Sequence, residues 1–231
     1  MKTALITGSN KGLGLEYVKQ LLKQSYQVIA TCRSPNAATE LNNIASTNPQ
    51  LTVMPLDMTL DSDIQSLKSK INTQTIDLLV LNAGIRGEEN VKIGQPINRD
   101  NLLSVMNTNT YGPIKLVESL FDNLKSSKSP ILAVATSRVA SIKDNTSGGC
   151  YAYRASKAAL NAIMHSFAID VQDMGIKVLL LHPGWVRTTI TRRNGLIDPP
   201  ESVKGMLNII FNHQDYPSGS FIHYQGYTLP W

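Results

Sequence analysis

Short, continuous apolar runs alternate with stretches of helical periodicity along this chain of 231 residues. In residues 77–81 (DLLVL), for example, the four positions after Asp77 are apolar in succession, which is typical of parallel strands covered on both faces. Between the runs, apolar residues recur at helical spacing, as Ile64, Leu67 and Ile71 do. This alternation predicts an α/β fold with a mostly parallel sheet.

The pattern predicts a single doubly wound, Rossmann-like domain over residues 1–231, because no repeat, linker or low-complexity tract interrupts it. The expected strands are 2–7, 27–31, 51–56, 77–81, 130–136, 176–182 and 220–224. The expected helices are 37–46, 98–123 with a bend near Gly112-Pro113, 151–174 and 199–212, with two more that start after Gly14 and at Asp61. We expect a seven-stranded sheet with helices on both faces.

Composition narrows the class of protein. The hydrophobic share of 42% and the charged share of 17% are those of a globular protein with a substantial core. Although the net charge is +5, Lys and Arg are scattered, so we expect no nucleic-acid partner. No apolar run has the length of a membrane span, and Cys32 and Cys150 form neither a disulfide framework nor a metal-ligand pattern. We therefore expect a cytoplasmic protein without a metal.

A glycine-rich turn follows the first predicted strand. Its residues are Gly8, Ser9, Asn10, Lys11, Gly12, Leu13 and Gly14, with the spacing Gly-x-x-x-Gly-x-Gly. Glycines let a backbone turn tightly and approach a pyrophosphate, and the N-terminus of the following helix favours negative charge. An ordinary glycine turn is the alternative, but the position directly after the first strand favours dinucleotide binding.

Tyr153 and Lys157 are four residues apart on a predicted helix, so their side chains lie on one face. A phenol with a pKa of about 10 is a poor proton donor at neutral pH, and a neighbouring ammonium lowers that pKa. The spacing alone also fits a solvated pair. Tyr151 lies close by, but it has no lysine four residues later.

Further motifs occur in a fixed order along the chain. They are Asn82-Ala83-Gly84 after the fourth strand, Asn109-Thr110-Tyr111-Gly112 on the long helix, Ser137 after the fifth strand, and Pro183-Gly184 with Thr188 after the sixth. With the glycine turn and the Tyr-x-x-x-Lys pair, this set resembles the short-chain dehydrogenase/reductase family. The stretch 182–188 (HPGWVRT) and the closing Leu229-Pro230-Trp231 resemble its C-factor and sniffer-type carbonyl reductases.

The resemblance implies hydride transfer between a nicotinamide and a carbonyl or alcohol carbon of a small molecule. Tyr153 is expected to donate a proton to the carbonyl oxygen, and Ser137 to hydrogen-bond it. Lys157 is expected to lower the tyrosine pKa and bind the nicotinamide ribose, and Asn109 to hold a water that links Lys157 to solvent. Without the resemblance, the alternative interpretation is that Ser137 caps a turn and that Asn109 is a buried structural amide.

The residue after the second strand predicts the type of dinucleotide. An acidic residue there would favour NAD, whereas this chain has Arg33, with Lys11 in the glycine turn. Both suit a 2′-phosphate, so we expect NADP(H). The other expected cofactor contacts, implied by the resemblance, are Asp57, Met58, Asn82, Ala83, Gly84, Tyr153, Lys157, Pro183, Gly184, Val186 and Thr188.

Two loops, 85–98 and 186–198, are expected to border the substrate. Arg192 and Arg193 fit either an anchor for an anionic group or a solvated lid, and Cys150 and Trp185 are candidates for the pocket lining. His165 and His182 are expected to be structural. The alternative to a reductase is a dinucleotide-binding sensor or C-factor-like signalling protein with incidental turnover. The direction of the reaction stays open, as does assembly into a homodimer or homotetramer.

Overall fold

The computed structural model describes residues 1–88 and 94–231, and their seven strands form one sheet. The strands are β1 (Thr3–Thr7), β2 (Gln27–Cys32), β3 (Leu51–Pro55), β4 (Leu78–Leu81), β5 (Ile131–Ala135), β6 (Lys177–His182) and β7 (Ser220–His223). Their order is β3-β2-β1-β4-β5-β6-β7, and every neighbouring pair is parallel. The predicted fold class is confirmed.

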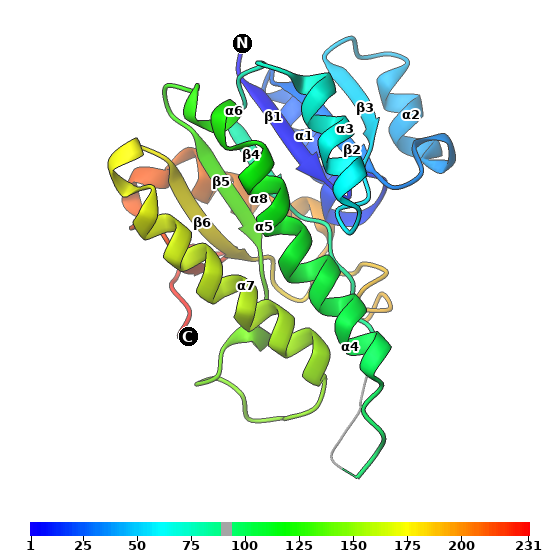
Figure 1. Cartoon of the computed structure of the whole chain (residues 1–231), viewed down its shortest axis with the longest axis vertical. Helices are drawn as coiled ribbons and strands as arrows, with labels where there is room; N and C mark the ends of the chain where they lie inside the picture. Colours follow the sequence, from blue (N-terminus) through cyan, green and yellow to red (C-terminus); the bar gives the residue numbers. More distant parts are fainter. Residues whose placement is uncertain (89–93) are drawn as a thin grey trace.

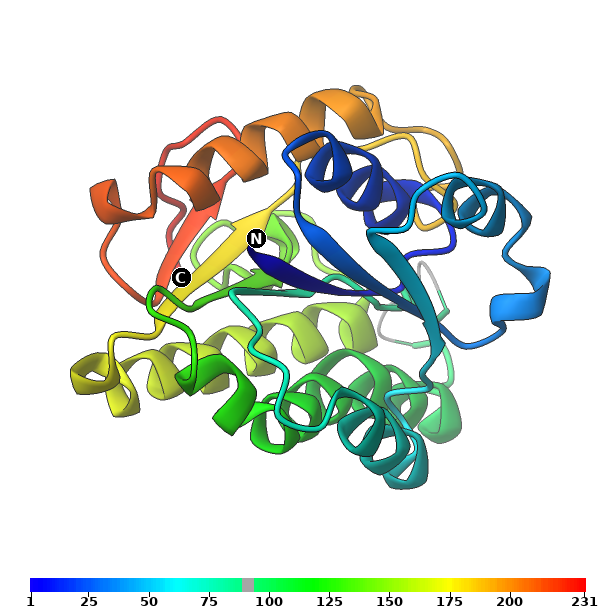
Figure 2. The ribbon, with the colours of Figure 1, turned by 90° about the horizontal axis from the view of Figure 1, so that it is seen from above.

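Helices cover both faces of the sheet, as Figure 2 shows. The helices are α1 (Gly12–Lys23), α2 (Thr39–Ala45), α3 (Asp61–Ile71), α4 (Arg99–Met106), α5 (Gly112–Ser119), α6 (Phe121–Lys125), α7 (Tyr151–Asp170) and α8 (Pro199–Phe211). Buried residues of α1, α2 and α8 form one core with the sheet, and those of α3, α5 and α7 form another. Two cores on opposite faces explain why the strands are continuous apolar runs.

The direction of the strand order reverses between β1 and β4 (Figure 1). From β1 the chain builds outward through β2 and β3, and it then returns to add β4 to β7 on the other side. The loops that leave the carboxyl ends of β1 and β4 therefore diverge. Such a switch point is where open α/β sheets bind ligands.

The predicted single helix over 98–123 is wrong in detail. Its span contains α4, a π-turn at Asn107–Tyr111, α5 and α6. Pro113 has no N–H to donate to the carbonyl of Asn109, and the N–H of Gly112 bonds to the carbonyl of Asn107 instead. The expected irregularity near Gly112-Pro113 is thus present, and it lies at a predicted site residue.

Other boundaries differ by a few residues. The predicted helix 151–174 comprises α7 and a 3₁₀ turn at Gln172–Met174, and Gly175 follows in the left-handed region with φ 71°. The predicted helix 37–46 is shorter because a 3₁₀ turn at Pro35–Ala37 precedes α2. On α7, Ile163 is 37% exposed, whereas Phe167 packs against the core.

None of the helices in residues 1–88 and 94–231 has the length and apolar character needed to cross a membrane. Within the same residues, no group of three or more His, Cys, Asp or Glu side chains could hold a metal ion. Cys32 and Cys150 are free thiols, and Cys32 is buried.

Candidate active site

The carboxyl ends of β1 and β4 are joined by the side chain of Thr7. Its hydroxyl accepts hydrogen bonds from the backbone N–H groups of Asn82 and Ala83, each at 3.0 Å. In return, the Asn82 amide donates to the carbonyl oxygens of Thr7 at 2.9 Å and Gly8 at 3.3 Å. The predicted Asn82-Ala83-Gly84 motif is therefore fixed against the start of the glycine turn.

The glycine turn has no room for side chains at its two closest approaches. Gly8 has φ 69°, and a Cβ there would lie 2.9 Å from the Cα of Ala83. A Cβ on Gly14 would overlap the carbonyl oxygen of Gly8 and lie 2.7 Å from the Asn82 amide nitrogen. The bare backbone leads directly into the N-terminus of α1, the geometry that suits a phosphate group.

The remaining turn residues face in different directions. Ser9 is fully buried, and its hydroxyl donates to the carbonyl of Ile6 while its N–H donates to that of Thr31. Ser9 therefore fastens the turn to β1 and β2. Asn10 and Lys11 are exposed.

Arg33 is exposed immediately after β2, in the position expected of a cofactor contact. After β3, Asp57 is half-buried and accepts hydrogen bonds from the N–H and hydroxyl of Thr59, whereas Met58 is buried in the core.

The loop after β6 reaches the glycine turn. Thr188 lies above Gly12, since a Cβ on that glycine would be 3.6 Å from the Thr188 methyl carbon. Val186 is buried and bridges to Ile197. Pro183 accepts a hydrogen bond from Ser202 at 2.6 Å, and Gly184 has φ 84° with no space for a Cβ beside Tyr224.

Ser137 and Tyr153 meet across the end of β5, where their hydroxyls share a hydrogen bond. Burial raises the pKa of Tyr153, while the hydrogen bond to Ser137 and the positive charge of Arg86 lower it. Ser137 also accepts the N–H of Val139 at 3.4 Å, so it caps a 3₁₀ turn as well. The two interpretations of Ser137 are thus compatible.

Lys157, one helical turn after Tyr153 on α7, is only 4% exposed. Burial lowers the pKa of its amine to about 8. The ammonium donates to the carbonyl oxygen of Ala135 at 2.8 Å, and a Cβ on Gly84 would be 3.7 Å from its Nζ. Lys157 therefore connects the end of β5 with the loop after β4.

The Asn109 side chain is fully buried at the π-turn. Its oxygen accepts the N–H of Ile85 at 2.8 Å, and its amide donates to the carbonyl of Ile85 at 2.7 Å and the hydroxyl of Ser156 at 3.0 Å. A Cβ on Gly84 would lie 3.1 Å from the Asn109 oxygen. Asn109 thus ties the helical segment to the loop beyond β4 and to α7.

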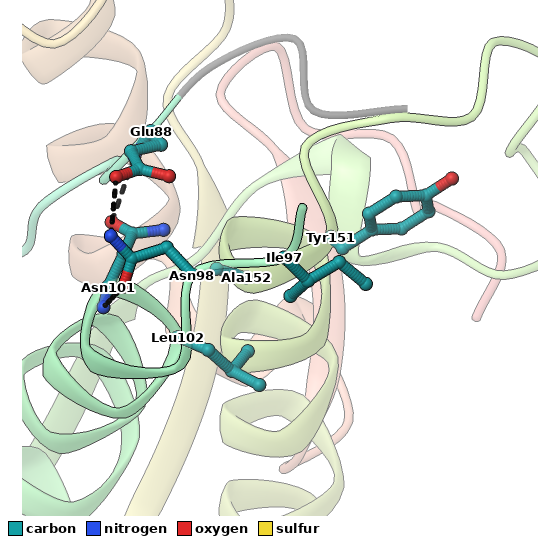
Figure 3. Close-up of a pocket in the computed structure, with 7 residues that line it drawn as sticks. All are labelled: Glu88, Ile97, Asn98, Asn101, Leu102, Tyr151 and Ala152. Atoms are coloured by element: carbon teal, nitrogen blue, oxygen red, sulfur yellow. Dashed lines mark hydrogen bonds between the residues drawn. The ribbon is translucent and has the colours of Figure 1, made fainter. Parts of the chain in front are cut away.

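Other polar and aromatic side chains near the site lie outside this group. Tyr151 is 37% exposed and borders a small pocket with Ile97, Leu102 and Ala152 (Figure 3). Ser141 donates to the carbonyl of Trp231. His165 contacts the ring of Trp231, which agrees with a structural role.

The sequence argument missed two contributors. Thr7 fixes the motif after β4, and Arg86 reaches the neighbourhood of Tyr153. The position of Arg86, two residues after Asn82-Ala83-Gly84, is the signal that could have found it. Cys150 was expected as a pocket candidate, and its sulfur lies 3.9 Å from an Arg86 nitrogen. Of the predicted substrate loop 85–98, residues 89–93 lie outside the described residues.

A glycine turn at a switch point, next to a paired tyrosine and lysine, defines the class of dinucleotide-dependent oxidoreductases. The family model for short chain dehydrogenases matches residues 2–196. The chain therefore belongs to the short-chain dehydrogenase/reductase family.

Individual relatives agree with this assignment. The chain is 34% identical to the C-signal of Myxococcus xanthus over 168 residues, which is 73% of this chain and 100% of that protein. It superposes on the carbonyl reductase Sniffer of D. melanogaster with TM-score 0.89 and 32% identity, covering 100% of both chains. An NADPH-bound carbonyl reductase from chicken fatty liver gives TM-score 0.90 and 32% identity, covering 100% of this chain and 99% of that one.

Proposed function

We propose that the protein is an NADPH-dependent reductase of ketones, aldehydes or quinones. One observation carries this proposal: Tyr153 meets Ser137 at the end of β5, one helical turn along α7 from the buried Lys157, at the edge that also holds the glycine turn. A protein that only bound a nucleotide would have no need of a half-buried phenol next to a buried amine on the same helix. The similarity to two carbonyl reductases supports the type of substrate.

The described residues fit a dinucleotide. Gly8 and Gly14 leave bare backbone at the N-terminus of α1, where a pyrophosphate is favoured. Arg33 and Lys11 supply positive charge for a 2′-phosphate, which distinguishes NADPH from NADH. Thr188, above Gly12, is suited to hold the nicotinamide end.

Bound NADPH supplies the hydride that converts the carbonyl carbon to an alcohol. As negative charge builds on the carbonyl oxygen, Ser137 donates a hydrogen bond to it and Tyr153 donates its proton. The raised pKa of Tyr153 keeps the phenol protonated before the reaction, as a proton donor must be.

We assign the return of a proton to Tyr153 to Lys157 and Asn109. Lys157, whose pKa of about 8 lies close to neutrality, is able to hold or release a proton there. Asn109 lies next to Lys157. The backbone carbonyl of Asn109 lacks the usual helical N–H donor four residues later, because that residue is Pro113. We assign this region the water link between Lys157 and solvent.

The test is NADPH oxidation with a panel of aldehydes, ketones and quinones, using the native protein, Tyr153→Phe and the control Tyr151→Phe. The control removes a phenolic hydroxyl two residues away that is exposed. We expect Tyr153→Phe to lower kcat by roughly 10²- to 10⁴-fold with NADPH affinity retained, and Tyr151→Phe to match the native protein. Turnover that survives in Tyr153→Phe would overturn the proposal.

Cofactor choice has its own test, a comparison of KM for NADPH and NADH. Loss of a charge-assisted contact in Arg33→Ala should raise KM for NADPH by roughly 10- to 100-fold and leave KM for NADH unchanged. Equal KM values for the two cofactors in the native protein would refute the assignment to NADPH.

The similarity to C-signal favours one alternative, a dinucleotide-binding signalling protein with incidental turnover. That alternative predicts tight NADPH binding, little turnover with any carbonyl compound, and no difference between the native protein and Tyr153→Phe.

A further inference from the structure

Thr136 lies between two residues that contact the proposed catalytic groups. Ala135, the residue before it, accepts a hydrogen bond from the Lys157 ammonium at 2.8 Å. Ser137, the residue after it, forms a hydrogen bond with Tyr153. Planar peptide units fix the spacing of neighbouring Cα atoms, so a shift of Thr136 would move both contacts at once.

Thr136 is itself fixed by two hydrogen bonds that lead to different elements. Its backbone N–H donates to the carbonyl of Leu181 on β6 at 2.9 Å, so the sheet still holds the chain one residue beyond β5. Its hydroxyl donates to the side-chain oxygen of Asn161 on α7 at 2.6 Å. The first bond fixes Thr136 within the sheet, and the second fixes it against the helix.

The bond between Thr136 and Asn161 is shielded from water, because each residue is only 3% exposed. A hydrogen bond is stronger electrostatically in such surroundings than at the surface. Its loss would also leave a buried oxygen without a donor. The bond therefore holds the end of β5 firmly against α7.

Asn161 lies on the same face of α7 as Tyr153 and Lys157. It follows Lys157 by four residues and Tyr153 by eight, so the three side chains are stacked along the helix. Because α7 is continuous from Tyr151 to Asp170, a displacement at Asn161 is transmitted to the other two. A bond from Asn161 thus sets the distance of this face from the sheet.

We propose that Thr136 and Asn161 are positioning residues of the reductase site. Their bond sets the distance between the end of β5 and α7 at which Ser137 reaches Tyr153 and Lys157 reaches its carbonyl acceptor. The alternative is that the bond satisfies two buried polar groups and contributes to stability alone. This inference rests on the proposed reductase activity and adds how its catalytic groups are held together.

The test measures kcat and KM for NADPH with a carbonyl compound that the native enzyme reduces, together with urea unfolding. Thr136→Val keeps the shape of threonine and removes the donor, whereas Thr136→Ser keeps the donor. We expect Thr136→Val to lower kcat by roughly 10- to 100-fold with KM for NADPH unchanged, because small displacements of catalytic groups have effects of this size. Thr136→Ser should retain most of the native kcat.

Ser127→Ala is the matched control, at the opposite end of β5. Ser127 is buried ahead of this strand, and its hydroxyl donates to the Asp77 carboxylate at 2.6 Å, the length of the bond from Thr136. Loss of this bond should lower the urea midpoint and leave kcat at the native value. A loss of stability alone would then be shown not to reduce turnover.

The double variant Thr136→Val/Asn161→Leu separates positioning from stability. Apolar groups of similar shape replace both partners, so its urea midpoint should lie closer to the native value than that of Thr136→Val. Its kcat should stay low, because an apolar contact lacks the direction of a hydrogen bond. Recovery of kcat together with stability, a native kcat in Thr136→Val, or an equal loss of kcat in Ser127→Ala would overturn the inference and leave the reductase assignment intact.

A titration of the Lys157 amine tests the inference without turnover. Nuclear magnetic resonance of isotope-labelled lysine, with Lys157→Met to assign the signal, gives its pKa in each protein. Burial lowers this pKa to about 8, and the hydrogen bond to Ala135 favours the charged form. A displaced acceptor should therefore lower the pKa further in Thr136→Val and in the double variant, but not in Ser127→Ala.

This result would support the positioning role even if no carbonyl compound is reduced, the outcome that would instead sink the reductase proposal. A Lys157 pKa that is unchanged or raised in Thr136→Val would count against the positioning role.

Discussion

Two regions meet at the carboxyl edge of the sheet, and they are constructed differently. The cofactor floor, residues 7–14 with 82–84, is held by bonds between Thr7, Asn82 and the backbone and by glycines without space for a Cβ. The proposed substrate rim, residues 85–88 with 94–98 and 186–198, presents mostly exposed side chains such as Arg192, Arg193 and Leu196. In the floor the shape of the backbone matters, whereas in the rim the identity of the side chains does.

This difference explains what each region tolerates. A dinucleotide is recognised largely by backbone N–H groups, so any added atom in the floor obstructs it. A substrate is selected by charge and shape at the rim, where one side chain replaces another without disturbing the fold. Substitutions in the floor should therefore change stability and cofactor binding together, whereas those in the rim should change ligand binding or activity with little effect on stability.

The largest effect is expected from Gly14→Ala. The new methyl group would overlap the carbonyl oxygen of Gly8, so the floor must shift. We expect a loss of about 3 kcal/mol or more in the free energy of unfolding, together with loss of NADPH binding. Urea unfolding and fluorescence titration measure the two.

Gly12→Ala is the matched control, because Gly12 has φ 58° but open space, with Thr188 no closer than 3.6 Å. Backbone strain alone should cost about 1 kcal/mol there. Equal destabilisation by the two variants would show that the close approach at Gly14 is unimportant.

Thr7→Val is expected to have the next largest effect. Valine has the shape of threonine but leaves the N–H groups of Asn82 and Ala83 without the acceptor that each has at 3.0 Å. Buried donors without partners should cost about 2 to 3 kcal/mol in total, and KM for NADPH should rise. Thr31→Val, which removes one long bond to the carbonyl of Ile6 at 3.3 Å, serves as the control and should cost less than about 1 kcal/mol.

The floor was the more predictable region from the sequence. Glycines at 8 and 14 and the Asn82-Ala83-Gly84 motif have few physical explanations other than close backbone contact, and the structure brings them together. The alternation of apolar runs with helical stretches likewise predicted the parallel sheet. A bend near Gly112-Pro113 was expected, but its form, a π-turn at Asn107–Tyr111, was not, because periodicity does not show which carbonyl Pro113 leaves without its partner.

The rim was less predictable. The only sequence signal for Arg86 is its place two residues after Asn82-Ala83-Gly84, and the backbone around it depends on bonds from Asn109 and Asn101 that connect segments distant in sequence. The expected effect of Lys157 on Tyr153 was also incomplete, because burial raises the pKa of the phenol and Arg86 is the cation that lowers it. The burial of a side chain and the charges near it depend on how the whole chain packs. Local sequence patterns do not contain that information.

His182 is the last residue of β6, shortly before the rim segment 186–198, and it should make the protein sensitive to acid. Burial, aided by His223, lowers its pKa to about 3, and its buried Nδ1 has no partner within the described residues. The unfolded imidazole gains a proton near pH 6.5, so the free energy of unfolding should fall as the pH drops below that value. At pH 5 the loss attributable to His182 is about 2 kcal/mol.

His182→Phe removes the titrating group and keeps a ring next to His223. We expect its stability at pH 7 to be close to native and its loss of stability between pH 6.5 and 5 to be smaller by about 2 kcal/mol. Urea unfolding at the two pH values measures this. Parallel stability curves for the variant and the native protein would contradict the role of His182.

The smallest effect on stability is expected from Arg187→Gln, in the rim. Arg187 forms two bonds with Asp198, at 2.7 and 2.9 Å, and donates to the carbonyls of Gly195 and Leu196. These bonds close the loop that begins with Thr188, but they are exposed to water, so breaking them should leave the melting temperature almost unchanged. The hydrogen bond to Arg187 lowers the pKa of Asp198, so the pair stays charged at neutral pH.

The consequence of Arg187→Gln should appear in binding instead. Without the pair, Thr188 is held less firmly above Gly12, and KM for NADPH should rise by roughly threefold, since an exposed ion pair contributes less than about 1 kcal/mol. Lys19→Gln, which breaks the exposed pair with Glu40 on the far side of α1, should leave KM unchanged. A drop in melting temperature as large as that of Thr7→Val would contradict the distinction between the two regions, because the rim would then contribute to the fold as the floor does.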